Sequence, residues 1–177
     1  MLRKRRIGLA AAAAAAIIIV VIAYMVAAKS ALSCGYTAGW KAMREADVEL
    51  LDDNGKAVAV HVRVADDAGT RATGFQHICP SAIDANQILF VFPQARMVRF
   101  HMHNVHAALD IAFFHSNGAV ISVTRMEPYG PEAEGPRPLY GPAVPVRYAL
   151  EAAPGFFAAR NISARGGRLQ IDSLNTL

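Results

Sequence analysis

Residues 58–64, Val58-Ala59-Val60-His61-Val62-Arg63-Val64, alternate strictly between valine and another residue type. Successive side chains of a β-strand point to opposite faces of a sheet, so the four valines would share one face. This alternation predicts a strand with one face packed in a hydrophobic core. The stretch therefore indicates a domain built on a β-sheet.

The sequence on both sides continues this pattern. Residues 52–55, Asp-Asp-Asn-Gly, have the composition of a tight hairpin turn, and residues 47–51 before them are the expected partner strand. Short apolar or alternating runs predict further strands at 88–92, 98–104, 109–114, 119–125, 146–151 and 168–172. Two short helical segments are predicted at 66–75 and 155–161. The pattern favours a mainly β fold, an antiparallel β-sandwich or a barrel-like, jelly-roll-like domain with one or two short helices.

An uncharged apolar run occupies residues 7–28, directly after a basic cluster at residues 3–6. A helix of about 20 apolar residues spans a bilayer, whereas the apolar core of a cleaved signal usually has about 7–15 residues. We therefore expect an N-terminal transmembrane helix that contacts the membrane through residues 7–28. The alternative is secretion after signal cleavage, for which Ala31-Leu32-Ser33 would suit the protease.

The basic cluster predicts the orientation of the chain. Basic residues stay on the cytoplasmic side, so the expected location is the inner (plasma) membrane, single pass, with the C-terminal domain in the periplasm or outside the cell. The predicted organisation is an anchor or signal segment at 1–28, a tether at 29–46 and a β domain at 47–177. In an oxidising compartment Cys34 and Cys79 could form a disulfide, and two separate thiols are the alternative.

The net charge gives no indication of nucleic acid binding. Residues 3–6 account for the whole net charge of +4, and the rest of the chain has equal numbers of basic and acidic residues. The pI of about 9.3 thus belongs to the targeting segment. We predict no nucleic acid partner.

Residues 98–110 hold three of the six histidines of the chain. If 98–104 is a strand, Arg99, His101 and His103 project from one face. Imidazole binds Zn and other divalent transition metals, so His101, His103 and His106 are candidate metal ligands. The alternative is that the histidines fill a partly exposed strand face without a metal.

Four residues are candidates for contact with an organic ligand: Arg99, Asn104, Asp110 and His77. Arginine binds carboxylate or phosphate through two parallel hydrogen bonds, and Arg99 and His77 could lie at one rim. Asn104 and Asp110 are polar residues in an apolar stretch and need partners if they are buried. They could instead bond loop backbone and hold two strands together, which is the structural alternative.

The ordered set of motifs resembles a known family. Its pieces are Val62–Asp66, Thr70–Phe75, Ile88–Pro93, Phe100–Asn104, Leu109–Phe114, Asn117-Gly118, Val146–Glu151 and Gly155. Together they resemble domain-of-unknown-function family number 192 over roughly residues 47–173. The resemblance implies a compact, mainly β fold of a single-domain, often exported protein, and it implies no established activity.

The chain differs from the family where the candidate metal ligands lie. The family commonly has Trp in the place of His101 and Lys in the place of His103, so a metal site there would be particular to this chain or to a subgroup. The function that we expect is a membrane-tethered extracytoplasmic binding or interaction module, with no catalysis implied. The alternative is a metal-binding protein or metal-dependent enzyme that uses the His-x-His pair.

Overall fold

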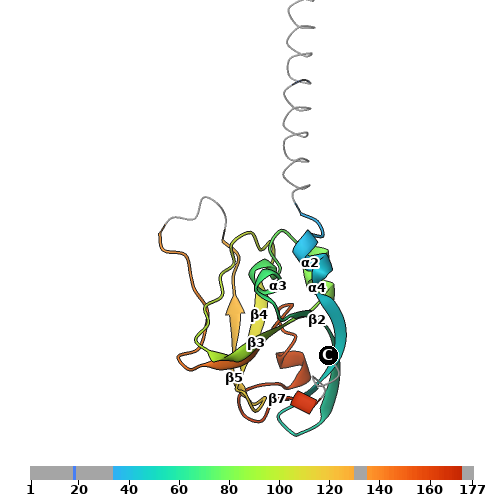
Figure 1. The fold of residues 1–177 in the computed structure, drawn as a ribbon, viewed down its shortest axis with the longest axis vertical. Helices are drawn as coiled ribbons and strands as arrows, with labels where there is room; N and C mark the ends of the chain where they lie inside the picture. The colour runs from blue at the N-terminus through green and yellow to red at the C-terminus, as the bar shows by residue number, and fades with distance from the viewer. Residues whose placement is uncertain (1–17, 19–33, 130–134, 173–177) are drawn as a thin grey trace, which may run out of the picture. The chain divides into compact units, whose positions relative to one another are not determined.

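The computed structural model describes Ile18, residues 34–129 and residues 135–172. The chain divides into two compact units, residues 1–35 and 36–177, and the sheet belongs to the second. Seven strands form one sheet in the order β5-β4-β6-β3-β2-β1-β7 (Figure 1). The strands are β1 (Arg44–Leu51), β2 (Ala57–Ala65), β3 (Ile88–Arg96), β4 (Leu109–Phe114), β5 (Val120–Met126), β6 (Val146–Ala152) and β7 (Arg168–Leu169).

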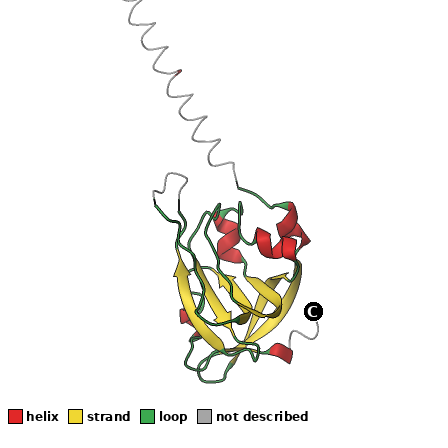
Figure 2. Ribbon diagram, turned by 60° about the vertical axis from the view of Figure 1, so that its left-hand side comes forward, coloured by secondary structure: helices red, strands yellow, loops and turns green. Residues whose placement is uncertain are grey.

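The helices are short and connect these strands. They are α2 (Ala38–Ala42), α3 (Ala68–Thr73), α4 (Pro80–Ala85) and the 3-10 helix η1 (Ala158–Arg160). In Figures 1 and 2, α2, α3 and α4 lie together at one end of the sheet. The segment that was predicted as a tether, residues 29–46, contains α2 and the start of β1. The sequence pattern did not predict α4, which begins with Pro80 in its first turn, a position that tolerates proline.

The prediction of a mainly β fold is confirmed, but the strands form one sheet and not the two packed sheets of a β-sandwich. The sheet curls into a half-barrel (Figure 2), so one sheet replaces the two packed sheets of the sandwich alternative. All strand pairs are antiparallel except β2 and β3, which pair parallel with Val64 opposite Leu89. Parallel neighbours require a long connection, and α3 and α4 provide it.

The hairpin between β1 and β2 forms as its composition predicts. Gly55 has a φ of +80°, a conformation that favours glycine. The Asp52 side chain accepts hydrogen bonds from the backbone N–H groups of Asn54 and Lys56, each at 2.8 Å. These bonds fix the turn and therefore the register, in which Val60 lies opposite Val48.

The two faces of the sheet bury separate hydrophobic cores. Val60, Val62 and Val64 of β2 are buried in one core, as their alternation predicts. β3 lies inside the sheet and is buried on both faces, with Phe90 in one core and Leu89 in the other. The first core includes Trp40 and Met43, together with Phe75 after α3 and Ile83 of α4. That core therefore fills the space between the sheet and the three α-helices.

The N-terminal predictions fall mostly on residues that the structure does not describe. Of the predicted anchor, residues 7–28, only Ile18 is described. Within the described part of the chain, no helix has the length and apolar character needed to cross a membrane. Cys34 and Cys79 are each disulfide-bonded, so the alternative of two separate thiols is not what the structure shows.

Candidate functional site

The segment between β3 and β4 is a loop, and the prediction of a strand at 98–104 is wrong. Its one ladder contact is an isolated bridge between Phe100 and Tyr140. The chain then turns, because Asn104 adopts a φ of +56° and the backbone N–H of Val105 donates to the carbonyl of Met102 at 3.2 Å. Asparagine tolerates this left-handed conformation better than most residues, and a strand cannot continue through it.

The histidines of this loop form two neighbouring pairs: the ring centroids of His101 and His103 lie 6.3 Å apart, and His106 packs beside His77. His101 faces a cavity, and its Nδ1 accepts a hydrogen bond from the backbone N–H of His103 at 3.3 Å. The His103 Nδ1 lies 3.0 Å from a guanidinium nitrogen of Arg137. His106 lies next to His77, with ring centroids 6.4 Å apart.

No predicted metal site assembles in the part of the chain that the structure describes. No three His, Cys, Asp or Glu side chains converge there in a way that could hold an ion. His101 and His103 lie near each other, with ring centroids 6.3 Å apart, but among the described residues no third ligand converges with them.

His77 and Asn104 meet through their backbones. The N–H of His77 donates to the carbonyl of Asn104 at 2.8 Å, and both residues have positive φ values, +62° and +56°. This bond ties the loop after α3 to the loop before β4. Their chain neighbours Gln76 and Val105 line the cavity, whereas His77 and Asn104 do not.

Asp110 holds strands and a loop together, which is the structural alternative that the sequence analysis offered for it. It lies in β4, 7% exposed, and forms an ion pair with Arg125 of the neighbouring strand β5. Its other oxygen accepts a hydrogen bond from the backbone N–H of Gly155 at 2.6 Å. The carboxylate thus joins β4, β5 and the loop after β6, and its oxygens are occupied by protein donors.

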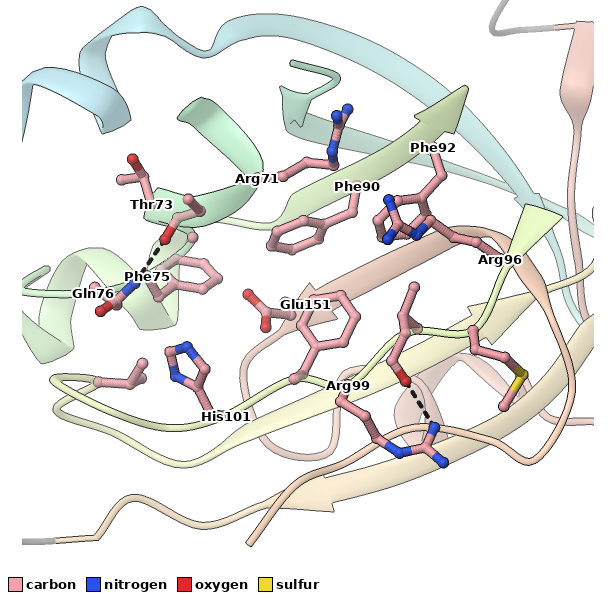
Figure 3. A pocket seen from close by; sticks show the side chains of 16 residues that line it. Arg71, Thr73, Phe75, Gln76, Phe90, Phe92, Arg96, Arg99, His101 and Glu151 are labelled. Carbon is pink, nitrogen blue, oxygen red and sulfur yellow. Dashed lines mark hydrogen bonds between the residues drawn. The ribbon is translucent and has the colours of Figure 1, made fainter. Parts of the chain in front are cut away.

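A cavity of about 270 Å³ lies where these loops meet the sheet (Figure 3). The loop after α3, the end of β3, the segment from Arg96 to His101 and one residue of β6 enclose it. Phe75, Phe90, Phe92 and Phe100 supply aromatic walls, and Arg71, Arg96, Arg99 and His101 supply the basic groups. Of the candidates named from sequence, Arg99 and His101 therefore do line one site.

Glu151 of β6 lines the inner side of this cavity, among Phe75, Phe90 and His101 (Figure 3). It is 5% exposed, and β6 runs between β3 and β4, so the residue projects from the middle of the sheet. No hydrogen bond or ion pair from another described residue reaches its carboxyl group. Burial alone raises the pKa of Glu151 from its usual 4.5 to about 8, since desolvation disfavours the charged form.

A glycine with a positive φ turns the chain beside this carboxyl group. Gly74 has a φ of +47°, and a Cβ atom there would lie 3.6 Å from Phe90 and 3.9 Å from the Glu151 carboxyl. A side chain at this position would be strained and would fill part of the cavity. The Thr-Gly-Phe turn after α3 is therefore shaped to leave the space open.

Backbone carbonyls hold two of the three cavity arginines in place. Arg99 donates from Nη1 to the carbonyl oxygens of Val98 at 2.8 Å and of Pro142 at 3.1 Å. Arg71 donates to the carbonyl oxygen of Val91 at 3.0 Å and lies over the ring of Phe92, 5.7 Å from its centroid. Arg96 is exposed, and no side-chain hydrogen bond from it to another described residue is present.

Sequence reasoning missed Glu151. Its strand was predicted, and its run Tyr148-Ala149-Leu150-Glu151-Ala152 contains one charged residue among apolar ones. A lone carboxylate inside a run that reads as buried on both faces is the signal that could have identified it. The sequence pattern does not show that β4 pairs with β6. Without that pairing, Glu151 reads as the polar end of a strand and not as a buried residue that lines a cavity.

Comparisons with known proteins agree with this fold. The chain is 26% identical over 118 residues to the UPF0127 protein PF1050 of Pyrococcus furiosus, a match that covers 66% of this chain and 90% of the relative. A crystal structure of a proposed transcription regulator from Sinorhizobium meliloti 1021 is 27% identical, with a TM-score of 0.60 over 72% of this chain and 94% of that one. A Novosphingobium aromaticivorans protein of unknown function, 20% identical, has a TM-score of 0.60 over 77% and 99% of the two chains and shows the same fold.

A family model also matches the sequence. The model DUF192, described as "Uncharacterized ACR, COG1430", matches residues 49–171. These residues include the cavity, Glu151 and all seven strands apart from the start of β1. The chain therefore belongs to the DUF192 family.

Proposed function

We propose that this protein is a membrane-tethered, extracytoplasmic binding module that takes a small polar molecule in the cavity around Glu151. The observation that carries the proposal is a buried carboxyl group that lines a cavity and has no donor from the described residues. A buried polar group without a hydrogen bond destabilises a fold by about 1–3 kcal/mol. A ligand that donates to Glu151 would remove this unfavourable term, so the site is suited to an occupant.

The size and composition of the cavity favour a small molecule over a macromolecule. Its volume of about 270 Å³ is close to the lower end of ligand pockets, roughly 300–1,000 Å³. Such pockets combine apolar and aromatic walls with a few polar groups that orient the ligand. Here the aromatic walls are phenylalanines, and the polar groups are Glu151, Arg96, Arg99 and His101.

The proposed location rests on two independent features. The basic residues at 3–6 and the apolar run at 7–28 favour an anchor with the domain outside the cytoplasm. The disulfide-bonded state of Cys34 and Cys79 suits an oxidising compartment, because cytosolic thiols are kept reduced. A phosphatase reporter fused after Leu177 should be active on the periplasmic side, and activity of a cytoplasmic reporter at the same position would contradict the orientation.

The binding proposal is tested with the purified full-length chain and a library of small polar metabolites. We expect one or more compounds to raise the melting temperature of the wild type and to leave that of Glu151→Leu unchanged, because leucine fills similar volume without a polar atom. Arg165→Gln is the matched control, since Arg165 is exposed and does not line the cavity. A hit that stabilises Glu151→Leu as strongly as the wild type would contradict the assignment of the site.

A further inference from the structure

The cavity holds a carboxyl group and guanidinium groups at separate places, which restricts the chemistry of its ligand. Glu151 forms no ion pair with Arg71, Arg96 or Arg99, although all four line the same space. We propose that the ligand is a small zwitterion, with an amine against Glu151 and a carboxylate at Arg96 and Arg99. This inference rests on the proposed function and specifies its ligand class.

The inner end of the cavity suits an ammonium group. Glu151 lies beside Phe75 and Phe90 (Figure 3), and the rings of Phe90 and Phe100 meet edge to face with centroids 5.0 Å apart. Aromatic faces attract cations, and a carboxylate accepts charge-assisted hydrogen bonds from an ammonium group. A neutral donor could bond the carboxyl group but would gain little from the rings.

The outer end suits a carboxylate. Arg99 is held by the carbonyls of Val98 and Pro142 through one nitrogen, which leaves its other N–H groups for a ligand. Arg96 has no side-chain partner among the described residues. Two guanidinium groups at the mouth would repel a ligand that carried only a positive charge, so the amine must be accompanied by an anionic group.

Proton release should accompany binding. Burial raises the pKa of Glu151 to about 8, so this carboxyl group is protonated in the empty cavity at neutral pH. An ammonium group stabilises the ionised form, and its binding therefore displaces the proton. The affinity should increase up to about tenfold per pH unit between pH 6 and pH 8.

The test uses the full-length chain and a matched series of probes. The zwitterions are ω-amino acids from glycine to 6-aminohexanoate, and n-butylamine and butyrate each carry one of the two groups of 4-aminobutyrate. Calorimetry in phosphate and Tris buffers measures affinity and proton release together. We expect at least one ω-amino acid to bind at least about tenfold more tightly than the amine or the acid alone.

Two variants assign the two ends of the ligand. Glu151→Gln should lower the affinity for the best ω-amino acid at least about tenfold and remove the dependence of the binding enthalpy on the buffer. Arg96→Gln should reduce the preference for that amino acid over an alkylamine of equal length. Arg165→Gln should change neither, and circular dichroism should show that all three variants are folded.

The possible failures are distinguishable. If butyrate binds as tightly as the zwitterions, or if Glu151→Gln binds normally, the amine assignment is wrong. If no probe binds but a metabolite from the library binds in a Glu151-dependent way, the zwitterion inference is wrong and the proposed function stands. If nothing binds at all, both are wrong.

Discussion

Two buried acids on neighbouring strands, Asp110 and Glu151, have opposite environments. Asp110 lies opposite Ala152 in the β4–β6 pair and Glu151 lies opposite Ile111, so the two side chains project from opposite faces of the sheet. Asp110 has protein donors on both oxygens, whereas Glu151 has none from the described residues. Their exposed fractions, 7% and 5%, are nearly equal. Burial therefore does not distinguish a structural acid from a candidate site, and the supply of donors does.

The strongest test of this comparison is Asp110→Ala. We expect it to lower the free energy of unfolding by about 2–3 kcal/mol, because the Gly155 N–H and the Arg125 guanidinium lose their acceptor. Urea unfolding of the full-length chain measures the change. A loss below about 0.5 kcal/mol would show that water replaces the carboxylate and that Asp110 does not join the strands.

Glu151→Leu should raise the free energy of unfolding, whereas Asp110→Ala should lower it. Replacing a carboxyl group that has no donor by an apolar side chain of similar size should raise the free energy of unfolding by about 1–2 kcal/mol at pH 7. The same urea titration measures it. If the variant is less stable than the wild type, Glu151 has a donor and the comparison with Asp110 fails.

The pH dependence of stability sharpens the comparison further. The pKa of Glu151 is about 8 in the folded state and near its usual 4.5 in the unfolded state. Between these values the folded state binds one proton more, so the contribution of Glu151 to stability is full below pH 4.5 and is lost as the pH rises through about 8. We expect the stability of the wild type to fall relative to Glu151→Gln by about 1 kcal/mol per pH unit between pH 5 and pH 8. A constant difference between the two proteins would contradict the raised pKa.

A half-buried acid, Asp53, should give the smallest effect of the three acids. Asp53 accepts hydrogen bonds from the Ser163 hydroxyl at 2.5 Å and from the Ser163 backbone N–H at 2.9 Å, and these bonds lower the pKa of Asp53. Asp53→Asn should therefore lower the melting temperature less than Asp110→Ala does. The difference from the wild type should disappear as the pH falls through the lowered pKa of Asp53, because the wild-type carboxylate is then also neutral. A difference that persists in acid would show that the bonds do not depend on charge.

The cavity also shows why part of the site was predictable. Arg99 and His101 were named because of their residue types, and both line the cavity although the strand that was invoked to align them does not exist. His103 and His106 were named by the same reasoning and do not line the cavity, since His103 lies beside His101 and next to Arg137, and His106 packs against His77. Residue type thus identified the region, and the local backbone conformation decided which side chains reach the cavity.

Local sequence patterns were enough to predict the regions of the seven strands, the β1–β2 hairpin and the separation of an apolar N-terminal run from a charge-balanced domain, but they also predicted a strand at 98–104 that does not form. These features depend on local physics, namely the alternation of side chains and the conformational preferences of Asn-Gly. Local patterns do not contain the parallel pairing of β2 with β3, the bond between Asp110 and Gly155, or the position of Glu151 at a cavity with no donor from the described residues. Each of these features depends on contacts between residues far apart in the chain. A buried carboxyl group is structural when distant segments supply its hydrogen-bond donors, as at Asp110, and is available to a ligand when they do not, as at Glu151.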